Sequence, residues 1–64
     1  MPLVTVSLFA GRTREQKESL AKAITDAFVE HAGNKKEDVQ IIFQDVERGD
    51  WARGGVLYDT PAAT

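Results

Sequence analysis

Hydrophobic and polar residues alternate along two stretches of the chain. In Leu3 to Phe9, one side of an extended backbone carries Val4, Val6 and Leu8, and β-branched residues are frequent. The stretch Val39 to Val46 alternates in the same way. An alternation of period two with many β-branched residues is typical of strands. The pattern therefore predicts one strand in each of the two stretches.

Between these strands the apolar residues recur at helical spacing. Thr13 is followed three residues later by Gln16, the spacing of a capping box, in which each side chain satisfies a backbone N–H at the start of a helix. Gly33 and Asn34 tolerate the left-handed conformation that ends a helix. A helix is therefore predicted from Arg14 to Ala32. Its apolar stripe consists of Leu20, Ile24, Ala27, Phe28 and Ala32.

The order strand, helix, strand predicts a single β-α-β unit and an α/β fold class. Such a crossover makes the two strands parallel and places the helix over one face of the sheet. Both strands carry apolar residues on both faces, which is the pattern of a sheet buried on two sides. We therefore expect a partner subunit to cover the second face.

Beyond the second strand, the sequence predicts a short C-terminal hairpin. Gly54 and Gly55 form a turn signal, and the apolar run Val56 to Tyr58 follows it. The folded domain is expected over residues 1–58. Residues 59–64 are expected to form a disordered tail.

Size and composition limit how this fold can be stabilised. The chain has 64 residues, of which 42% are hydrophobic and 28% charged, as in ordinary globular proteins. A chain of about 60 residues buries only roughly 60% of its unfolded surface. The absence of cysteine and the single histidine exclude disulfides and clusters of zinc ligands. Oligomerisation is the remaining way to stabilise the fold, and we expect neither a metal nor a cofactor.

Charge and hydropathy exclude two classes of partner. The formal net charge is -2, and the Lys and Arg residues are scattered, whereas a nucleic-acid binder normally has a basic face. No apolar run approaches the roughly 20 residues of a membrane span, and the amino terminus lacks the basic and apolar regions of a signal peptide. We therefore expect a cytoplasmic protein that binds neither nucleic acid nor membrane.

Pro2 is the first candidate for chemistry, because it directly follows Met1. A small residue at this position generally permits removal of the methionine, which would leave a free prolyl secondary amine at the start of the first strand. That amine could act as a base if an apolar pocket and nearby guanidinium groups lowered its pKa toward neutrality. The alternative is that Pro2 is a tolerated start to an edge strand.

Arg12 is the second candidate, since it lies between the first strand and the helix, where backbone N–H groups favour anions. About 33 Å of extended chain separates it from Pro2, so the two cannot serve one small site within one subunit. Gln40 starts the second strand and is expected at the same end of the sheet as Pro2. A site that combines all three requires subunit interfaces. Trp51 could wall such a site or anchor an interface, and Arg53 could reach an anion held against Trp51 or remain solvated.

Together these features resemble the 4-oxalocrotonate tautomerase family. The resemblance covers about Pro2 to Tyr58 and rests on short motifs that occur in the family's order and spacing. The motifs are Pro2 directly after Met1, Gly11-Arg12, Glu15-Gln16-Lys17, the aromatic Trp51 and Gly54-Gly55. The resemblance implies a β-α-β subunit that dimerises and assembles as a trimer of dimers. We expect a homo-hexamer, and a hetero-oligomer stays open as the alternative.

The resemblance also implies an isomerase, namely a keto-enol tautomerase of a small unsaturated 2-oxo acid. Mature Pro2 would be the general base, Arg12 of a neighbouring subunit would bind a substrate carboxylate, and Trp51 would keep the site dry. Gln40 departs from the family, whose well-studied tautomerases have a second arginine at this position. A charge-assisted hydrogen bond is roughly twice as strong as a neutral one, so weaker turnover of dicarboxylates is expected. Whether Gln40 or Arg53 replaces that arginine stays open.

Two other functions stay open beside the tautomerase. A related lyase of the dehalogenase or decarboxylase type would use the proline as a cation or with an activating carboxylate, and no such carboxylate can be placed at a strand end here. A non-catalytic oligomeric binding module would follow if Met1 is retained, because an acylated proline nitrogen has no lone pair to act as a base.

Overall fold

Within residues 1–61, which a computed structural model describes, the chain forms a long helix, two long strands and a small hairpin. The elements in chain order are β1 (Leu3–Phe9), α1 (Arg14–Ala32), the 3-10 turn η1 (Lys36–Asp38), β2 (Gln40–Val46), the 3-10 turn η2 (Arg48–Asp50), β3 (Ala52–Arg53) and β4 (Val56–Leu57). The predicted first strand and helix are confirmed at both bounds. β2 starts at Gln40 and not at Val39, because the Val39 N–H donates to the Lys36 carbonyl oxygen at 3.2 Å and so closes η1.

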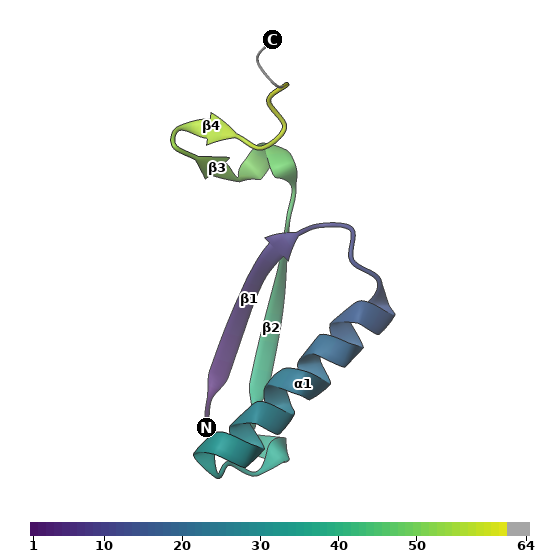
Figure 1. Ribbon diagram of the computed structural model, residues 1–64, viewed down its shortest axis with the longest axis vertical. Coiled ribbons are helices and arrows are strands. Elements are labelled where there is room, and N and C mark those ends of the chain that lie inside the picture. The colour runs from purple at the N-terminus through teal and green to yellow at the C-terminus, as the bar shows by residue number, and fades with distance from the viewer. Residues whose placement is uncertain (62–64) are drawn as a thin grey trace.

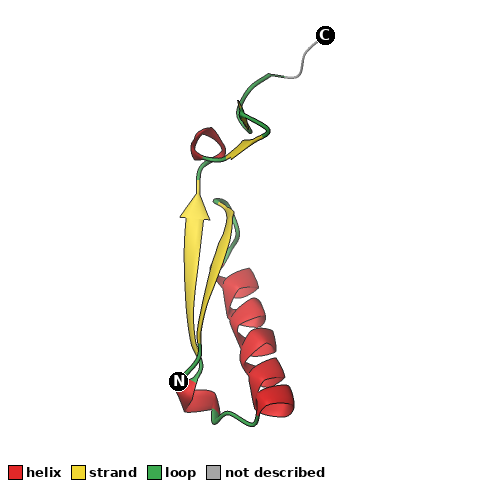
Figure 2. Ribbon diagram, turned by 90° about the vertical axis from the view of Figure 1, so that its left-hand side faces the viewer, coloured by secondary structure: helices red, strands yellow, loops and turns green. Residues whose placement is uncertain are grey.

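β1 and β2 lie side by side and parallel, joined through α1, which confirms the predicted β-α-β unit (Figure 1). Their register pairs Leu3 with Gln40 at one end and Phe9 with Val46 at the other. α1 covers one face of the two strands, and the opposite face has no covering layer among the described residues (Figure 2). The strand pair therefore has one face packed against the helix and one face open.

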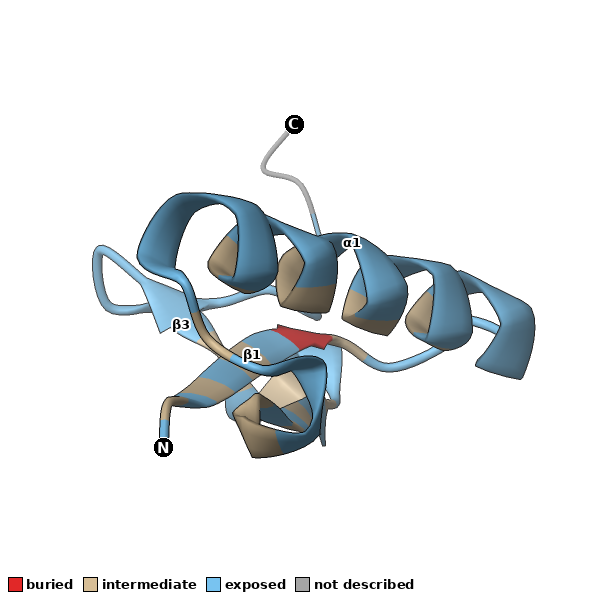
Figure 3. Cartoon of the chain, turned by 90° about the horizontal axis from the view of Figure 1, so that it is seen from below, coloured by how far each residue is buried: buried red, intermediate tan, exposed pale blue. Residues whose placement is uncertain are grey.

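The packed side encloses little core. Leu8, on the helix-facing side of β1, is 8% exposed and is the one buried residue within 1–61, while half-buried residues line the inner side of α1 (Figure 3). On the open face, Leu3 and Ile42 are 57% and 51% exposed. The radius of gyration is 15.5 Å, against about 11 Å for a compact domain of this length. So small a core favours association with further subunits.

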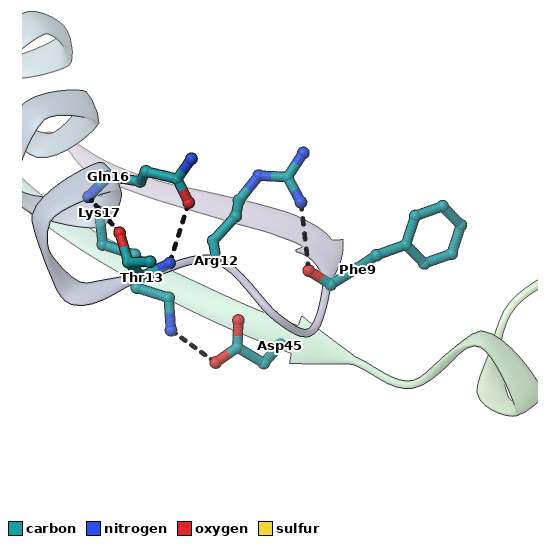
Figure 4. A network of polar contacts seen from close by, with 6 residues as sticks. All are labelled: Phe9, Arg12, Thr13, Gln16, Lys17 and Asp45. Carbon is teal, nitrogen blue, oxygen red and sulfur yellow. Dashed lines mark hydrogen bonds and ion pairs between the residues drawn. The ribbon is translucent and has the colours of Figure 1, made fainter.

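Polar contacts fix both ends of α1. The Thr13 N–H donates to Gln16 Oε1 at 2.9 Å and the Gln16 N–H donates to Thr13 Oγ1 at 3.1 Å, so the predicted capping box is confirmed (Figure 4). Gly33 ends the helix in the left-handed conformation with a φ of 72°. Lys17 Nζ lies 2.6 Å from Asp45 Oδ2 and ties the first turn of α1 to β2. The connection from β1 to α1 therefore has a defined position on the sheet.

The outer face of α1 is polar. Ion pairs of the i,i+4 type join Arg14 to Glu18 at 3.0 Å and Lys22 to Asp26 at 2.7 Å. The hydrogen bond to Asp26, followed by its charge, raises the pKa of Lys22 above its ordinary value. Within residues 1–61, no helix is both long enough and apolar enough to cross a membrane.

β3 and β4 form the predicted C-terminal hairpin, which extends beyond the carboxyl ends of β1 and β2 (Figure 1). Gly54 and Gly55 form its turn with φ values of 60° and 81°. Positive φ at both turn positions is what a type I′ turn requires, and glycine adopts it at no steric cost. The Tyr58 N–H donates to the Trp51 carbonyl oxygen at 2.9 Å and closes the base of the hairpin.

The predicted disordered tail, residues 59–64, falls only partly on the described chain. Residues 59–61 follow the hairpin, and the Thr60 N–H donates to the Leu57 carbonyl oxygen at 3.0 Å. Residues 62–64 lie outside the described residues.

Candidate active site

The amino end of the strand pair carries Pro2 and Gln40. The Gln40 N–H donates to the Pro2 carbonyl oxygen at 3.0 Å. Pro2 directly precedes Leu3, the residue of β1 that pairs with Gln40. Pro2 is half-buried and Gln40 is exposed. The parallel register thus places these two candidates side by side, as expected from the order of the strands.

Met1 contacts both of these candidates. It acylates the Pro2 nitrogen, so in this chain that nitrogen belongs to an amide and has no basic lone pair. Gln40 Nε2 donates to Met1 Sδ at 3.1 Å. Removal of Met1 would therefore free the proline nitrogen and the side-chain amide of Gln40 together.

Arg12 lies at the carboxyl end of the strand pair, in the connection between β1 and α1. Its Nη1 donates to the Phe9 carbonyl oxygen at 3.3 Å, and the residue is exposed (Figure 4). Gly11 directly before it has a φ of 120°, a conformation that glycine adopts far more easily than other residues. Arg12 and Pro2 are therefore at opposite ends of β1 (Figure 1).

Three aromatic rings gather at the same end as Arg12. The ring centroid of Phe9, the last residue of β1, lies 4.8 Å from that of Trp51 and 5.0 Å from that of Tyr58. The centroids of Trp51 and Tyr58 are 6.2 Å apart. We call these three residues the aromatic cluster. Trp51 is half-buried, so it anchors the C-terminal segment to β1 and leaves part of its ring as an accessible apolar surface.

Two further arginines follow β2. Arg53 lies on β3, opposite Val56 in the exposed hairpin. Arg48, in η2, has its Cζ atom 4.3 Å from the centroid of the Phe9 ring. Sequence reasoning missed Arg48 as a candidate. No signal in the sequence marks it, because the contact joins Phe9 to a turn that lies far away in the chain.

The structure thus divides the candidate residues into two groups at opposite ends of the strand pair. Pro2 and Gln40 form one group, and Arg12 lies near the aromatic cluster in the other. A small site that used both groups would have to combine the amino end of one chain with the carboxyl end of another. Among residues 1–61, no group of three His, Cys, Asp or Glu side chains is placed to hold a metal ion.

Comparison with known proteins gives the family to which this fold and these residues belong. The sequence model of the family described as "Tautomerase enzyme" matches residues 2–60. This chain therefore belongs to the tautomerase family. A protein named "Probable tautomerase" from Ralstonia nicotianae is 41% identical over 64 residues, which covers 100% of this chain and 98% of the relative.

Solved structures of 4-oxalocrotonate tautomerases share the fold. A structure from work on the isozymes of Methylibium petroleiphilum superposes with a TM-score of 0.83 at 37% identity, covering 89% of this chain and 92% of that chain. The heterohexameric enzyme of Chloroflexus aurantiacus gives a TM-score of 0.84 at 31% identity, covering 91% and 94%. The family resemblance carried by the short motifs is confirmed, together with the tautomerase fold.

Proposed function

We propose that this protein is a keto-enol tautomerase of a small unsaturated 2-oxo acid, with Pro2 as the general base after Met1 is removed. Membership of the tautomerase family supports an isomerase activity. The position of Pro2 at the start of β1 supports its role, because the loss of one residue would leave a secondary amine at this end of the sheet.

The proposed reaction is a proton transfer with no change of oxidation state overall. The neutral Pro2 nitrogen takes the proton of the enol oxygen and delivers it to a carbon of the conjugated chain. Gln40, next to Pro2, donates a hydrogen bond to the oxygen on which negative charge develops. Arg12 of a neighbouring subunit binds a substrate carboxylate, and Trp51 excludes water from the site.

The proposed assembly is a closed homo-hexamer, a trimer of dimers. The exposed apolar residues of the open face and the small core support association. The heterohexameric enzyme of Chloroflexus aurantiacus supports an assembly of six subunits. Pro2 and Arg12 lie at opposite ends of β1, and this separation is the observation that carries the proposal of a site shared between subunits.

Subunit complementation tests the shared site. Pro2→Ala replaces the secondary amine by a primary amine and Arg12→Ala removes the cation, so each chain should be strongly impaired alone. Co-assembled in equal amounts at random, they should regain about a quarter of the wild-type activity, because a site then draws an intact Pro2 and an intact Arg12 from different chains at even odds. A mixture that stays as impaired as the single variants, with mixed oligomers demonstrated by mass spectrometry, would contradict the shared site.

A non-catalytic binding module is a second candidate, which would follow if the mature protein retains Met1. With Met1 in place, the amide nitrogen of Pro2 cannot accept a proton and the Gln40 side chain already has a partner. Intact-mass measurement of the protein purified from its own cells decides between the two functions. A chain that begins at Pro2 supports the tautomerase, and a chain that keeps Met1 supports the binding module.

A further inference from the structure

Arg48 has an unusual combination of a fixed position and unused hydrogen-bond donors. Its guanidinium lies over the Phe9 ring, with 4.3 Å between Cζ and the ring centroid. This cation–π contact leaves N–H groups of the guanidinium available to donate hydrogen bonds elsewhere. Among residues 1–61, Arg14 is paired with Glu18, whereas Arg48 forms neither an ion pair nor a side-chain hydrogen bond.

The surroundings of Arg48 keep this position defined. The Trp51 N–H donates to the Arg48 carbonyl oxygen at 3.4 Å and closes η2. Next to Arg48, Gly49 lies against Asp59, and a Cβ atom at Gly49 would be only 2.7 Å from Asp59 Oδ2. Phe9, on which the guanidinium rests, is itself held by the other two rings of the aromatic cluster. An anion would therefore meet a guanidinium that has already lost much of its freedom, which lowers the entropic cost of binding.

Carboxylates lie near Arg48 in the chain without neutralising it. Glu47 precedes it and Asp50 follows two residues later, but neither forms an ion pair with Arg48. Arg12, which donates to the Phe9 carbonyl oxygen, is likewise free of an ion pair within residues 1–61. The Arg12 guanidinium thus contacts the backbone of Phe9, and the Arg48 guanidinium contacts its ring. The aromatic cluster provides an apolar surface beside them.

We propose that Arg48 binds a second substrate carboxylate, remote from the reacting carbon, and so determines specificity for dicarboxylates over monocarboxylates. The proposal rests on the tautomerase function proposed above. Gln40 beside Pro2 is neutral, so the positive charge available to a dianionic substrate comes from the carboxyl end of the strand pair. Arg12 supplies one charge and Arg48 the other, and the conjugated carbon chain of the substrate lies against the aromatic cluster.

Steady-state kinetics on the assembled protein that begins at Pro2 test this proposal. The substrates are an unsaturated 2-oxo dicarboxylate and the monocarboxylate of the same chain length. Arg48→Ala should raise KM for the dicarboxylate about tenfold, keep kcat within about twofold and leave the monocarboxylate unchanged. Arg48→Lys should recover part of the loss, because the charge remains while the planar fork of donors is lost. Arg14→Ala, which removes an arginine from the outer face of α1, should change neither substrate.

A binding measurement separates this proposal from the tautomerase function. Adipate and hexanoate are unreactive probes with two carboxylates and one, and Trp51, the single tryptophan, reports binding through its fluorescence. Arg48→Ala should weaken adipate about tenfold and hexanoate hardly at all. If Arg48→Ala weakens adipate binding in this way but the wild type turns over neither 2-oxo acid, Arg48 is confirmed as a carboxylate-binding residue and the tautomerase proposal fails.

Two results would overturn the role of Arg48. In the first, Arg48→Ala changes KM equally for both substrates or for neither, which means that the side chain only packs on Phe9. In the second, Arg53→Ala causes the loss specific to the dicarboxylate and Arg48→Ala does not, which assigns the second charge to the hairpin.

Discussion

At the amino end of the strand pair, Pro2 and Gln40 are positioned by a backbone hydrogen bond of 3.0 Å, whereas Arg12 and Arg48 at the carboxyl end are positioned by their side chains on Phe9. The amino end has the proposed base and a neutral donor. The carboxyl end has guanidinium groups and an apolar surface. The proposed base and the guanidinium groups therefore lie at opposite ends of one chain. The proposed chemistry needs a second subunit to bring them to one substrate.

The two ends should also respond differently to substitution. A position set by the register of parallel strands depends little on any single side chain, because the backbone hydrogen bonds persist. A position set by side-chain contacts depends on the residue that supplies them, which is Phe9 for both Arg12 and Arg48. We therefore expect the amino end to be sensitive to the chemistry of Pro2 itself and the carboxyl end to be sensitive to its supporting residues.

The largest effect should come from acylation of Pro2. Protein that retains Met1 should lose activity by roughly 10²–10⁴-fold, the typical contribution of general acid-base catalysis, because the amide nitrogen cannot take a proton. Preparations with and without Met1, defined by intact mass, should be compared on one 2-oxo acid enol. Equal rates in the two preparations would remove Pro2 from the mechanism.

The same preparations give the pH dependence. Activity of the chain that begins at Pro2 should rise with pH through a midpoint near neutrality, because the amine must be neutral to accept the enol proton. The midpoint should lie below the usual pKa of an aliphatic secondary amine, since a pocket that excludes water disfavours the charged form. A rate that falls as pH rises through this range would instead favour a cationic proline, as in the lyase-type alternative.

The second effect concerns the open face, which we propose as the interface between subunits. Ile42→Glu places a carboxylate where an apolar side chain is 51% exposed in one chain, and burying an unpaired charge costs several kcal/mol. We expect dissociation and a loss of activity of about a hundredfold at micromolar protein. Ala23→Glu on the exposed side of α1 is the matched control and should stay assembled. Light scattering measures both, and an Ile42→Glu variant that stays oligomeric and active would exclude the open face as the interface.

Local patterns were sufficient to predict most of the fold. The alternation of apolar and polar residues predicts β1, and the spacing of Thr13 and Gln16 predicts the start of α1. The double glycine predicts the hairpin turn. Each of these features depends on residues that are close in sequence. The proximity of Gln40 to Pro2 follows from the parallel order of the strands. In contrast, Arg48 reaches Phe9 from a turn that is far away in sequence, through packing that no spacing encodes.

A substitution that is expected to raise activity tests whether the missing charge at the amino end limits the reaction. Gln40→Arg adds a charge beside Pro2 and should raise kcat/KM for an unsaturated 2-oxo dicarboxylate by roughly tenfold, equivalent to about 1.4 kcal/mol. Arg12→Ala in the same chain should undo the gain, because the two ends act on one substrate. The added charge acts on the oxygen where negative charge develops, so its effect is separate from the carboxylate contacts proposed for Arg12 and Arg48. If Gln40→Arg changes nothing and the protein remains oligomeric, the proposed role of Gln40 at that oxygen fails.

The smallest effect should come from the cap that supports the carboxyl end. Thr13→Ala removes an acceptor that the Gln16 N–H uses at 3.1 Å, and the loss of such a cap costs about 1 kcal/mol. Urea unfolding at equal protein concentration measures this change, with Ser19→Ala on the exposed helix face as the control. Because Thr13 directly follows Arg12, a looser cap should also raise KM, by about twofold, without changing kcat. A loss of stability with no change in KM would mean that Arg12 is held by its contact with Phe9 alone, and that the helix start stabilises the fold without positioning the cation.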